Sequence, residues 1–106
     1  MRTLLAIGML ALSVGAASAN NTFGVLLDAE EGAGFYDIRL VRTLAPGVVE
    51  LRDSRGRVLG REEVRTGTTT SLRVDLGIRR MPRNGVFAVL VVDGVVVDRD
   101  RVRVVR

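Results

Sequence analysis

The sequence predicts an all-β protein, a single antiparallel β-sandwich of six or seven strands. Short runs rich in valine, leucine and threonine follow one another from Thr22 to the end of the chain. Turn residues separate these runs at short intervals. Several runs alternate apolar and polar residues with period two, which puts one face of a strand on a core and the other in solvent.

The first nineteen residues differ from the rest and predict a cleavable export signal. Arg2 supplies a positive start, Leu4–Val14 an apolar stretch, and Ala17-Ser18-Ala19 a small-residue cleavage site. A permanent membrane anchor is the alternative, but a spanning helix needs roughly 20 predominantly apolar residues, and this stretch is shorter and interrupted by glycine. We therefore expect removal of residues 1–19 and an exported domain of residues 20–106, periplasmic or secreted in a bacterium.

The first half of this domain predicts two strands around an acidic loop. Thr22–Leu27 is the first candidate strand, and Asp28–Gly34 is a glycine-rich acidic loop. Phe35–Thr43 then alternates as a strand does. One face is expected to carry Tyr36, Ile38 and Leu40, and the other Asp37, Arg39 and Val41.

A hairpin follows the break at Ala45-Pro46-Gly47. Val48–Arg52 and Arg57–Val64 are its strands, joined by Asp53-Ser54-Arg55-Gly56. Aspartate first and glycine fourth are the preferences of a type I turn followed by a bulge.

The second half predicts two further strands and a connector, followed by a return strand. Thr68–Asp75 alternates, with Leu72, Val74 and Leu76 expected inward, whereas Gly77–Gly85 is broken by proline and an Asn-Gly pair and is expected to hold no strand. Val86–Val92 is apolar on both faces and suits a central strand.

The last strand is predicted from a hairpin signal. Asp93-Gly94 is among the strongest short signals for a tight turn. The return strand is expected to begin at Val95–Val97 and to finish at Val102, Val104 and Val105.

Part of this order resembles a known group of domains. Val48–Leu59, Leu72–Leu76 and Asn84–Gly94 give a strand, an Asp-x-x-Gly turn, a Leu-x-x-x-Leu strand and a Gly-x-Phe strand with its hairpin. This order is similar to bacterial immunoglobulin-like and fibronectin type III-like exported modules, in which a tyrosine often stands at the place of Phe87. The resemblance implies a fold and no activity.

Composition argues against an enzyme. The chain contains no histidine and no cysteine, and all its basic residues are arginine. It therefore lacks the usual general base, thiolate nucleophiles and the lysine that forms Schiff bases. Carboxylate chemistry is the remaining catalytic alternative, and we expect no catalytic residues and no cofactor.

Two acidic groups are the only candidates for a metal site. Asp28, Glu30 and Glu31 lie in the first loop, and Asp98 and Asp100 near the end of the chain. Calcium takes six to eight oxygen ligands, so both groups would have to meet at one end of the sandwich. The spacing matches no calcium loop, and we expect solvated carboxylates and no metal.

Arginines near the end of the chain are the candidate anion-binding residues. Arg99, Arg101, Arg103 and Arg106 recur along the last strand and are expected to share one face as an arginine stripe. Guanidinium groups bind phosphate and carboxylate in bidentate fashion, so the stripe suits lipopolysaccharide or peptidoglycan. The alternative is a charged outer strand that blocks edge-to-edge pairing.

The favoured function is a non-enzymatic binding or assembly module that acts on another envelope or secreted protein. An edge at Val102, Val104 and Val105 would recruit a strand of that partner. Nucleic acid is not expected, because the domain is predicted to be exported and offers few aromatic residues for base stacking.

Overall fold

The computed structural model describes residues 21–106, and the predicted signal lies outside them. Strands make up the regular structure of this part, without a helix. The longer strands are β1 (Thr22–Leu26), β3 (Phe35–Thr43), β4 (Gly47–Asp53), β5 (Val58–Val64), β6 (Gly67–Asp75), β7 (Val86–Val92) and β8 (Val95–Val102), and the two short ones are β2 (Ala29–Glu30) and β9 (Val104–Val105). The prediction of an all-β fold with antiparallel sheets is confirmed.

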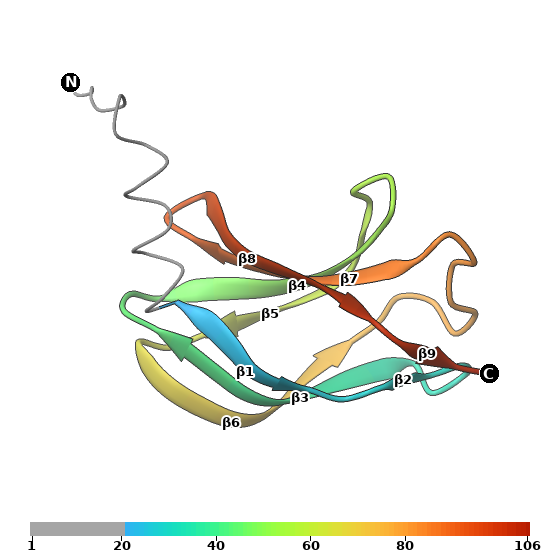
Figure 1. Cartoon of the computed structure of the whole chain (residues 1–106), viewed down its shortest axis with the longest axis horizontal. Coiled ribbons are helices and arrows are strands. Elements are labelled where there is room, and N and C mark those ends of the chain that lie inside the picture. The colour runs from blue at the N-terminus through green and yellow to red at the C-terminus, as the bar shows by residue number, and fades with distance from the viewer. Residues whose placement is uncertain (1–20) are drawn as a thin grey trace.

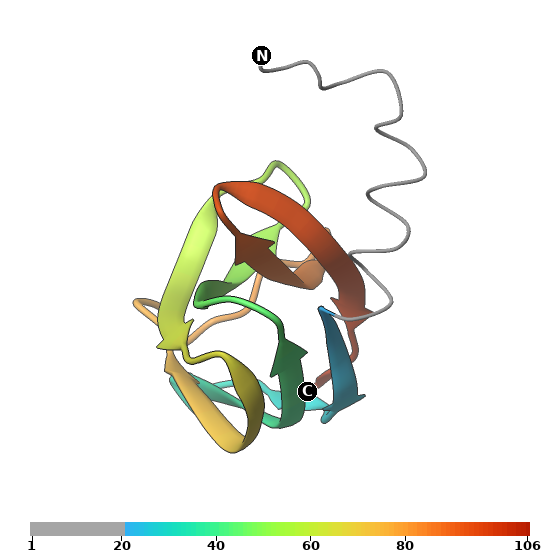
Figure 2. The ribbon, with the colours of Figure 1, turned by 90° about the vertical axis from the view of Figure 1, so that its left-hand side faces the viewer.

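Two antiparallel sheets hold the longer strands. One has the order β1-β3-β6 and the other β5-β4-β7-β8. The four-stranded sheet lies above the three-stranded one in Figure 1, and the end view in Figure 2 shows the strands of both sheets surrounding a common interior. β7 has neighbours on both sides, as its apolar sequence predicts.

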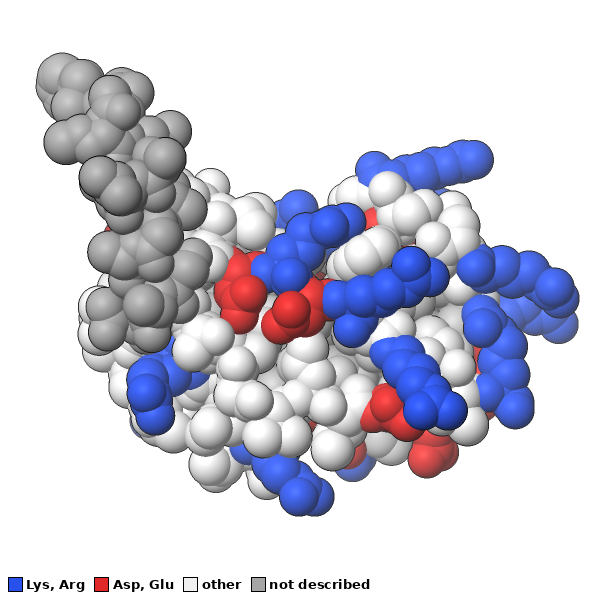
Figure 3. All heavy atoms as spheres, in the orientation of Figure 1, with Lys and Arg blue, Asp and Glu red and all other residues white. Residues whose placement is uncertain are grey.

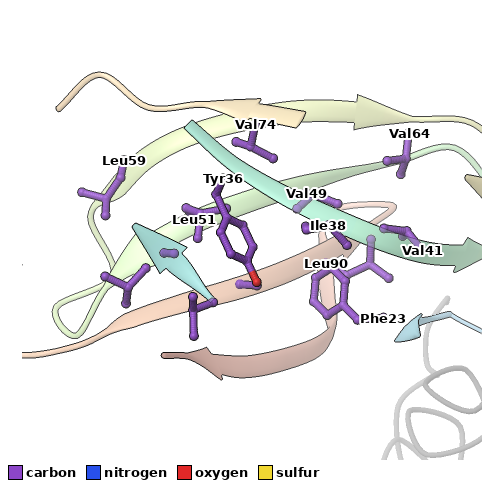
Figure 4. Close-up of a cluster of buried hydrophobic side chains, with 14 of the residues drawn as sticks. Phe23, Tyr36, Ile38, Val41, Val49, Leu51, Leu59, Val64, Val74 and Leu90 are labelled. Carbon is purple, nitrogen blue, oxygen red and sulfur yellow. The ribbon is translucent and has the colours of Figure 1, made fainter. Parts of the chain in front are cut away.

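The core lies between the two sheets, where β3 and β4 face each other (Figure 4). Tyr36 and Ile38 of β3 and Val49 and Leu51 of β4 are each at most 1% exposed. The Tyr36 hydroxyl donates a hydrogen bond of 2.6 Å to the carbonyl of Leu27. Burial and the nearby charge of Asp28 raise the pKa of this phenol, so Tyr36 stays neutral.

The predicted hairpin turns are present. Gly56 has a φ of 87°, its amide donates to the Asp53 carbonyl, and the Asp53 amide donates to the Arg57 carbonyl, which confirms the bulged turn. Asp93 and Gly94 both have positive φ values, of 54° and 75°. That combination matches the right-handed twist of the flanking strands.

The prediction that Val41 points away from the core is wrong. Tyr36 and Ile38 are buried, and then Val41 and Thr43 are buried instead of Leu40. The change of face occurs opposite Ser71, whose positive φ of 58° departs from the extended backbone within β6. Bulges in β1 accompany it, and bulges locally increase strand twist, so the later half of β3 buries its other side.

The end of the chain also departs from the prediction. The return strand is not continuous: β8 ends at Val102 in the four-stranded sheet, and β9 pairs in parallel with β2. β2 lies inside Asp28–Gly34, which the sequence predicts as a loop. Two-residue strands leave little periodicity in a sequence, and the pairing partner of β2 lies more than seventy residues away.

Side chains and close backbone contacts join the sheets along both open sides. On one side the Asp98 carboxylate of β8 accepts hydrogen bonds from the Phe23 amide (3.0 Å) and the Thr22 hydroxyl (3.1 Å) of β1. On the other side the Gly77 amide donates to the Leu59 carbonyl at 2.9 Å. A Cβ at Gly60 would lie 2.2 Å from the carbonyl oxygen of Asp75, so β5 and β6 approach this closely only because residue 60 is glycine.

A candidate anion-binding end

Arginine side chains gather at one end of the molecule. Figure 1 places the connector between β6 and β7 and strand β9 at the right-hand end, with the β4–β5 turn above β7 on the same side, and Figure 3 shows basic side chains crowded over that side. Two open hollows of about 640 and 470 Å³ lie there and share Arg83. We call the lining arginines the basic end: Arg55, Arg57, Arg79, Arg80, Arg83 and Arg106.

The β4–β5 turn presents two of these arginines because Asp53 holds its backbone. One Asp53 carboxylate oxygen accepts hydrogen bonds from the amides of Arg55 and Arg57, both at 2.9 Å. The Gly56 amide bonds to the Asp53 carbonyl at 3.0 Å and closes the turn. The Arg57 amide and then that of Arg55 lower the pKa of Asp53, so its carboxylate stays ionised. The side chain of Arg57 is 76% exposed and reaches solvent.

The connector is held by a buried methionine and by the acidic loop. Met81 is only 3% exposed, and its amide donates to the Glu31 carboxylate. The Gly32 amide donates to the Arg79 carbonyl at 2.9 Å. These contacts fix the backbone around Arg79, Arg80 and Arg83, whose exposed side chains are left pointing outward.

Arg106 closes the basic end from the C-terminus. Its guanidinium donates to the carbonyl of Pro82 at 3.1 Å and lies 3.6 Å from the Glu31 carboxylate. A segment near residue 30, the connector and the last residue therefore form one local structure.

The net charge of the domain is concentrated at this end. The two hollows are lined by six arginines and by two acids, Asp53 and Glu31. The rest of the described chain carries nine arginines and ten acids. The surface outside the basic end is therefore close to neutral, and the excess positive charge of residues 21–106 lies at one end of a molecule 45 Å long.

The four arginines of the predicted stripe do not form one group. Arg99 and Arg101 lie on β8, with their guanidinium carbons 4.0 and 5.9 Å from the centre of the Phe87 ring. Arg103 is exposed between β8 and β9. Arg106 belongs to the basic end. The break after Val102 separates them, because β9 pairs with β2 and not with β7.

The aspartates that alternate with the arginines along β8 lie on the opposite side of the sheet from Arg99 and Arg101. Asp98 and Asp100 lie opposite Leu90 and Ala88 in the β7–β8 register and therefore share the core-facing side of the sheet. Burial and then the charge of Asp98 raise the pKa of Asp100. Inward-pointing charge on an edge strand is a known protection against edge-to-edge pairing.

The residues of the predicted strand-addition edge are partly engaged. Val102 is 3% exposed on β8. Val104 and Val105 pair through their backbone with Ala29 and Glu30. Only the opposite side of β9 is left for an incoming strand, and strand addition there stays a prediction.

The two acidic groups considered for calcium have other partners. Glu31 binds the connector and Arg106, and Asp98 binds β1. Among residues 21–106 no three acids gather closely enough to hold a metal ion.

Sequence reasoning missed the contribution of the β4–β5 turn. The sequence shows the three arginines of the connector and the Asp-x-x-Gly turn only as separate features. Arg55 and Arg57 lie more than twenty residues from the connector, and only the sandwich brings them beside Arg83.

The chain matches no protein-family model, no curated protein and no solved structure. In the described part of the chain, no helix has the length and apolar character needed to cross a membrane.

Proposed function

We propose that this chain is a non-enzymatic, exported binding module whose basic end binds an anionic polymer of the bacterial envelope. The observation that carries the proposal is the grouping of six arginines around two adjoining hollows, while the rest of the described surface is nearly neutral. The division into three strands facing four supports kinship with immunoglobulin-like or fibronectin type III-like sandwiches.

The chemistry of the basic end suits phosphate and carboxylate groups. Guanidinium groups present planar pairs of donors that bind such oxyanions in bidentate fashion. Four of the six arginines have no carboxylate of residues 21–106 within salt-bridge distance: Arg55, Arg79, Arg80 and Arg83. Arg79 gives one of its donors to the Gly32 carbonyl at 3.5 Å, but the charge of these four arginines is not neutralised by a carboxylate in the described part of the chain. Lipopolysaccharide phosphates and peptidoglycan carboxylates are the envelope groups that fit.

A charge-matched pair of variants tests the proposal. Arg79, Arg80 and Arg83 are replaced by glutamine in one variant, and Arg39, Arg42 and Arg65, which lie outside the basic end, in the other. Both lose three positive charges. Binding to purified lipopolysaccharide and to peptidoglycan sacculi is measured at about 0.01 and 0.15 M salt, between which the Debye length falls from about 30 to about 8 Å.

We expect the parent to bind at least one polymer, with affinity that falls steeply as salt rises. The connector variant should lose at least tenfold in affinity at low salt, and the control less than threefold. Equal losses in both variants would show an effect of net charge alone and would overturn the proposed site, as would failure of the parent to bind either polymer.

A protein partner is the second candidate, favoured by exposed valines on an edge strand. Val95 and Val96 of β8 are 50% and 41% exposed, and strand addition uses such edges. Its binding should respond little to salt. Salt-insensitive capture of an envelope protein, lost when Val95 and Val96 are both replaced by threonine, would support this candidate over the first.

A further inference from the structure

The outer face of the four-stranded sheet combines apolar and basic rows. The register places Val96, Val91 and Val48 side by side across β8, β7 and β4. The next residues along β7 toward the basic end are Val89 and then Phe87, which have Arg99 and Arg101 as their β8 partners. One face therefore changes from valine to arginine over about 14 Å, since successive outward residues of a strand are about 7 Å apart.

In the middle of this face, charged side chains cover the apolar surface. Val89 points away from the core yet is 1% exposed. Its cross-strand neighbours are Glu50 and Arg99, and long charged side chains cover apolar surface with their aliphatic stems. Val96, at the other end, is 41% exposed. The hairpin end of the face thus offers apolar surface to a ligand.

The arginines of this face differ from another stacked arginine in the same molecule. Arg73 lies 3.8 Å from the centre of the Phe35 ring and is paired with Asp37 through bonds of 2.8 and 3.0 Å. Arg99 and Arg101 stack on Phe87, and in the described part of the chain neither has a carboxylate within salt-bridge distance. The first stack is neutralised within the protein, and the second is not.

This face also adjoins the basic end. A Cβ at Gly85 would lie 3.5 Å from the Arg101 guanidinium and 3.4 Å from the Phe87 ring. Asn84, the residue before it, lines the hollow that contains Arg55 and Arg83. Phosphate-binding groups thus continue from the end of the molecule onto the sheet.

We propose that the outer face of the four-stranded sheet binds a phosphate-bearing lipid, with the phosphate on Arg99 and Arg101 and an acyl chain along Val96, Val91 and Val48. This inference rests on the proposed function and narrows its ligand from anionic envelope polymers in general to those that carry lipid. Peptidoglycan has no acyl chain to fill the apolar row, whereas lipopolysaccharide and anionic phospholipids do.

The test uses a short-chain lipid in its monomeric state. Dihexanoyl phosphatidylglycerol is compared with glycerol phosphate, which carries phosphate without acyl chains, and with dihexanoyl phosphatidylcholine, which lacks net charge. Binding to the whole domain is followed by nuclear magnetic resonance. We expect phosphatidylglycerol to bind at least tenfold more tightly than either other compound. Tenfold equals about 1.4 kcal/mol, which burial of roughly 55 Å² of apolar surface supplies.

Two variants separate the parts of the site. Replacing Arg99 and Arg101 with glutamine should weaken phosphatidylglycerol binding at least fivefold, and Arg42 and Arg65 serve as the charge-matched control. Replacing Val48 and Val96 with threonine keeps side-chain shape and should reduce binding to the level of glycerol phosphate.

Soluble polyphosphate distinguishes this inference from the proposed function. It should bind the valine variant as it binds the parent, and it should bind the Arg99 and Arg101 variant no more weakly than it binds the Arg42 and Arg65 control. If polyphosphate binds but phosphatidylglycerol does so no better than glycerol phosphate, or the valine variant binds as the parent does, the lipid site is refuted and the basic end stands. If polyphosphate does not bind, the basic end is refuted.

Discussion

Asp98 is the residue whose removal should most clearly disturb the closure of the sandwich. One of its oxygens accepts hydrogen bonds from the Phe23 amide and the Thr22 hydroxyl, and the other accepts the Arg99 amide at 2.9 Å. The first two bonds tie β8 to β1 across one open side of the sandwich. Alanine at position 98 would leave the Phe23 amide without that acceptor.

The expected loss follows from the number and environment of these bonds. A hydrogen bond to a charged group contributes about 1.5–3 kcal/mol when buried. Both bonds to β1 are partly buried, and removal of the charge also relieves repulsion on Asp100. We therefore expect Asp98→Ala to lower the free energy of unfolding by about 1.5–3 kcal/mol in total. For a domain of this size that is a fall of at least about 6 °C in Tm.

Urea unfolding measures this change directly. The chain has one tyrosine and no tryptophan, so Tyr36 fluorescence reports on the core, with circular dichroism as a second probe. Glu62→Ala, an exposed change of the same charge on edge strand β5, is the control and should stay within about 0.5 kcal/mol. An Asp98→Ala protein as stable as the control would refute the bridging role of Asp98.

Three further changes test the core and its charges. Because the folded-state pKa of Asp100 is raised above its usual 3.8, ionised Asp100 destabilises the fold at neutral pH. Asp100→Asn should therefore raise the free energy of unfolding at pH 7. This gain should vanish as the pH falls below 3.8. A gain that persists in acid would contradict that origin. Tyr36→Phe removes the hydrogen bond to the Leu27 carbonyl and should lower the free energy of unfolding by about 1–2 kcal/mol, measured by urea titration with circular dichroism. An unchanged urea midpoint would contradict a stabilising role for this bond. Leu51→Ala leaves a cavity at a fully buried position and should lower the free energy of unfolding by about 2–5 kcal/mol. The loss should be visible as partial unfolding on heating. A loss under about 1 kcal/mol would show that the core is not packed as described.

Local patterns in the sequence were sufficient to predict most of the fold. The period-two pattern of Phe35–Thr43 and the Asp-Gly pair at 93 and 94 act over a few residues, and both elements form as predicted. The face of Val41 depends on a backbone irregularity at Ser71 on the paired strand. No pattern within a single strand records such an effect.

The candidate site was less predictable, because it depends on contacts between distant segments. Alternation predicts that Arg99 and Arg101 share a face, and they do. It cannot show that the strand ends at Val102 or that Arg106 turns toward Glu31. The same long-range packing brings the β4–β5 turn to the connector, so the charge concentration becomes visible only in three dimensions.

The central claim is that the basic end is the surface that binds anions. The most direct measurement follows the amide resonances of glycines at both ends of the molecule while the isotope-labelled domain is titrated with polyphosphate. Gly32, Gly56 and Gly85 lie at or beside the basic end. The β5–β6 and β7–β8 connections lie at the opposite end (Figure 1), and Gly67 begins β6 directly after the first of them while Gly94 belongs to the second. We predict that the first three resonances shift with polyphosphate and that the other two do not. Shifts confined to Gly67 and Gly94, or no shifts at low salt, would contradict the account.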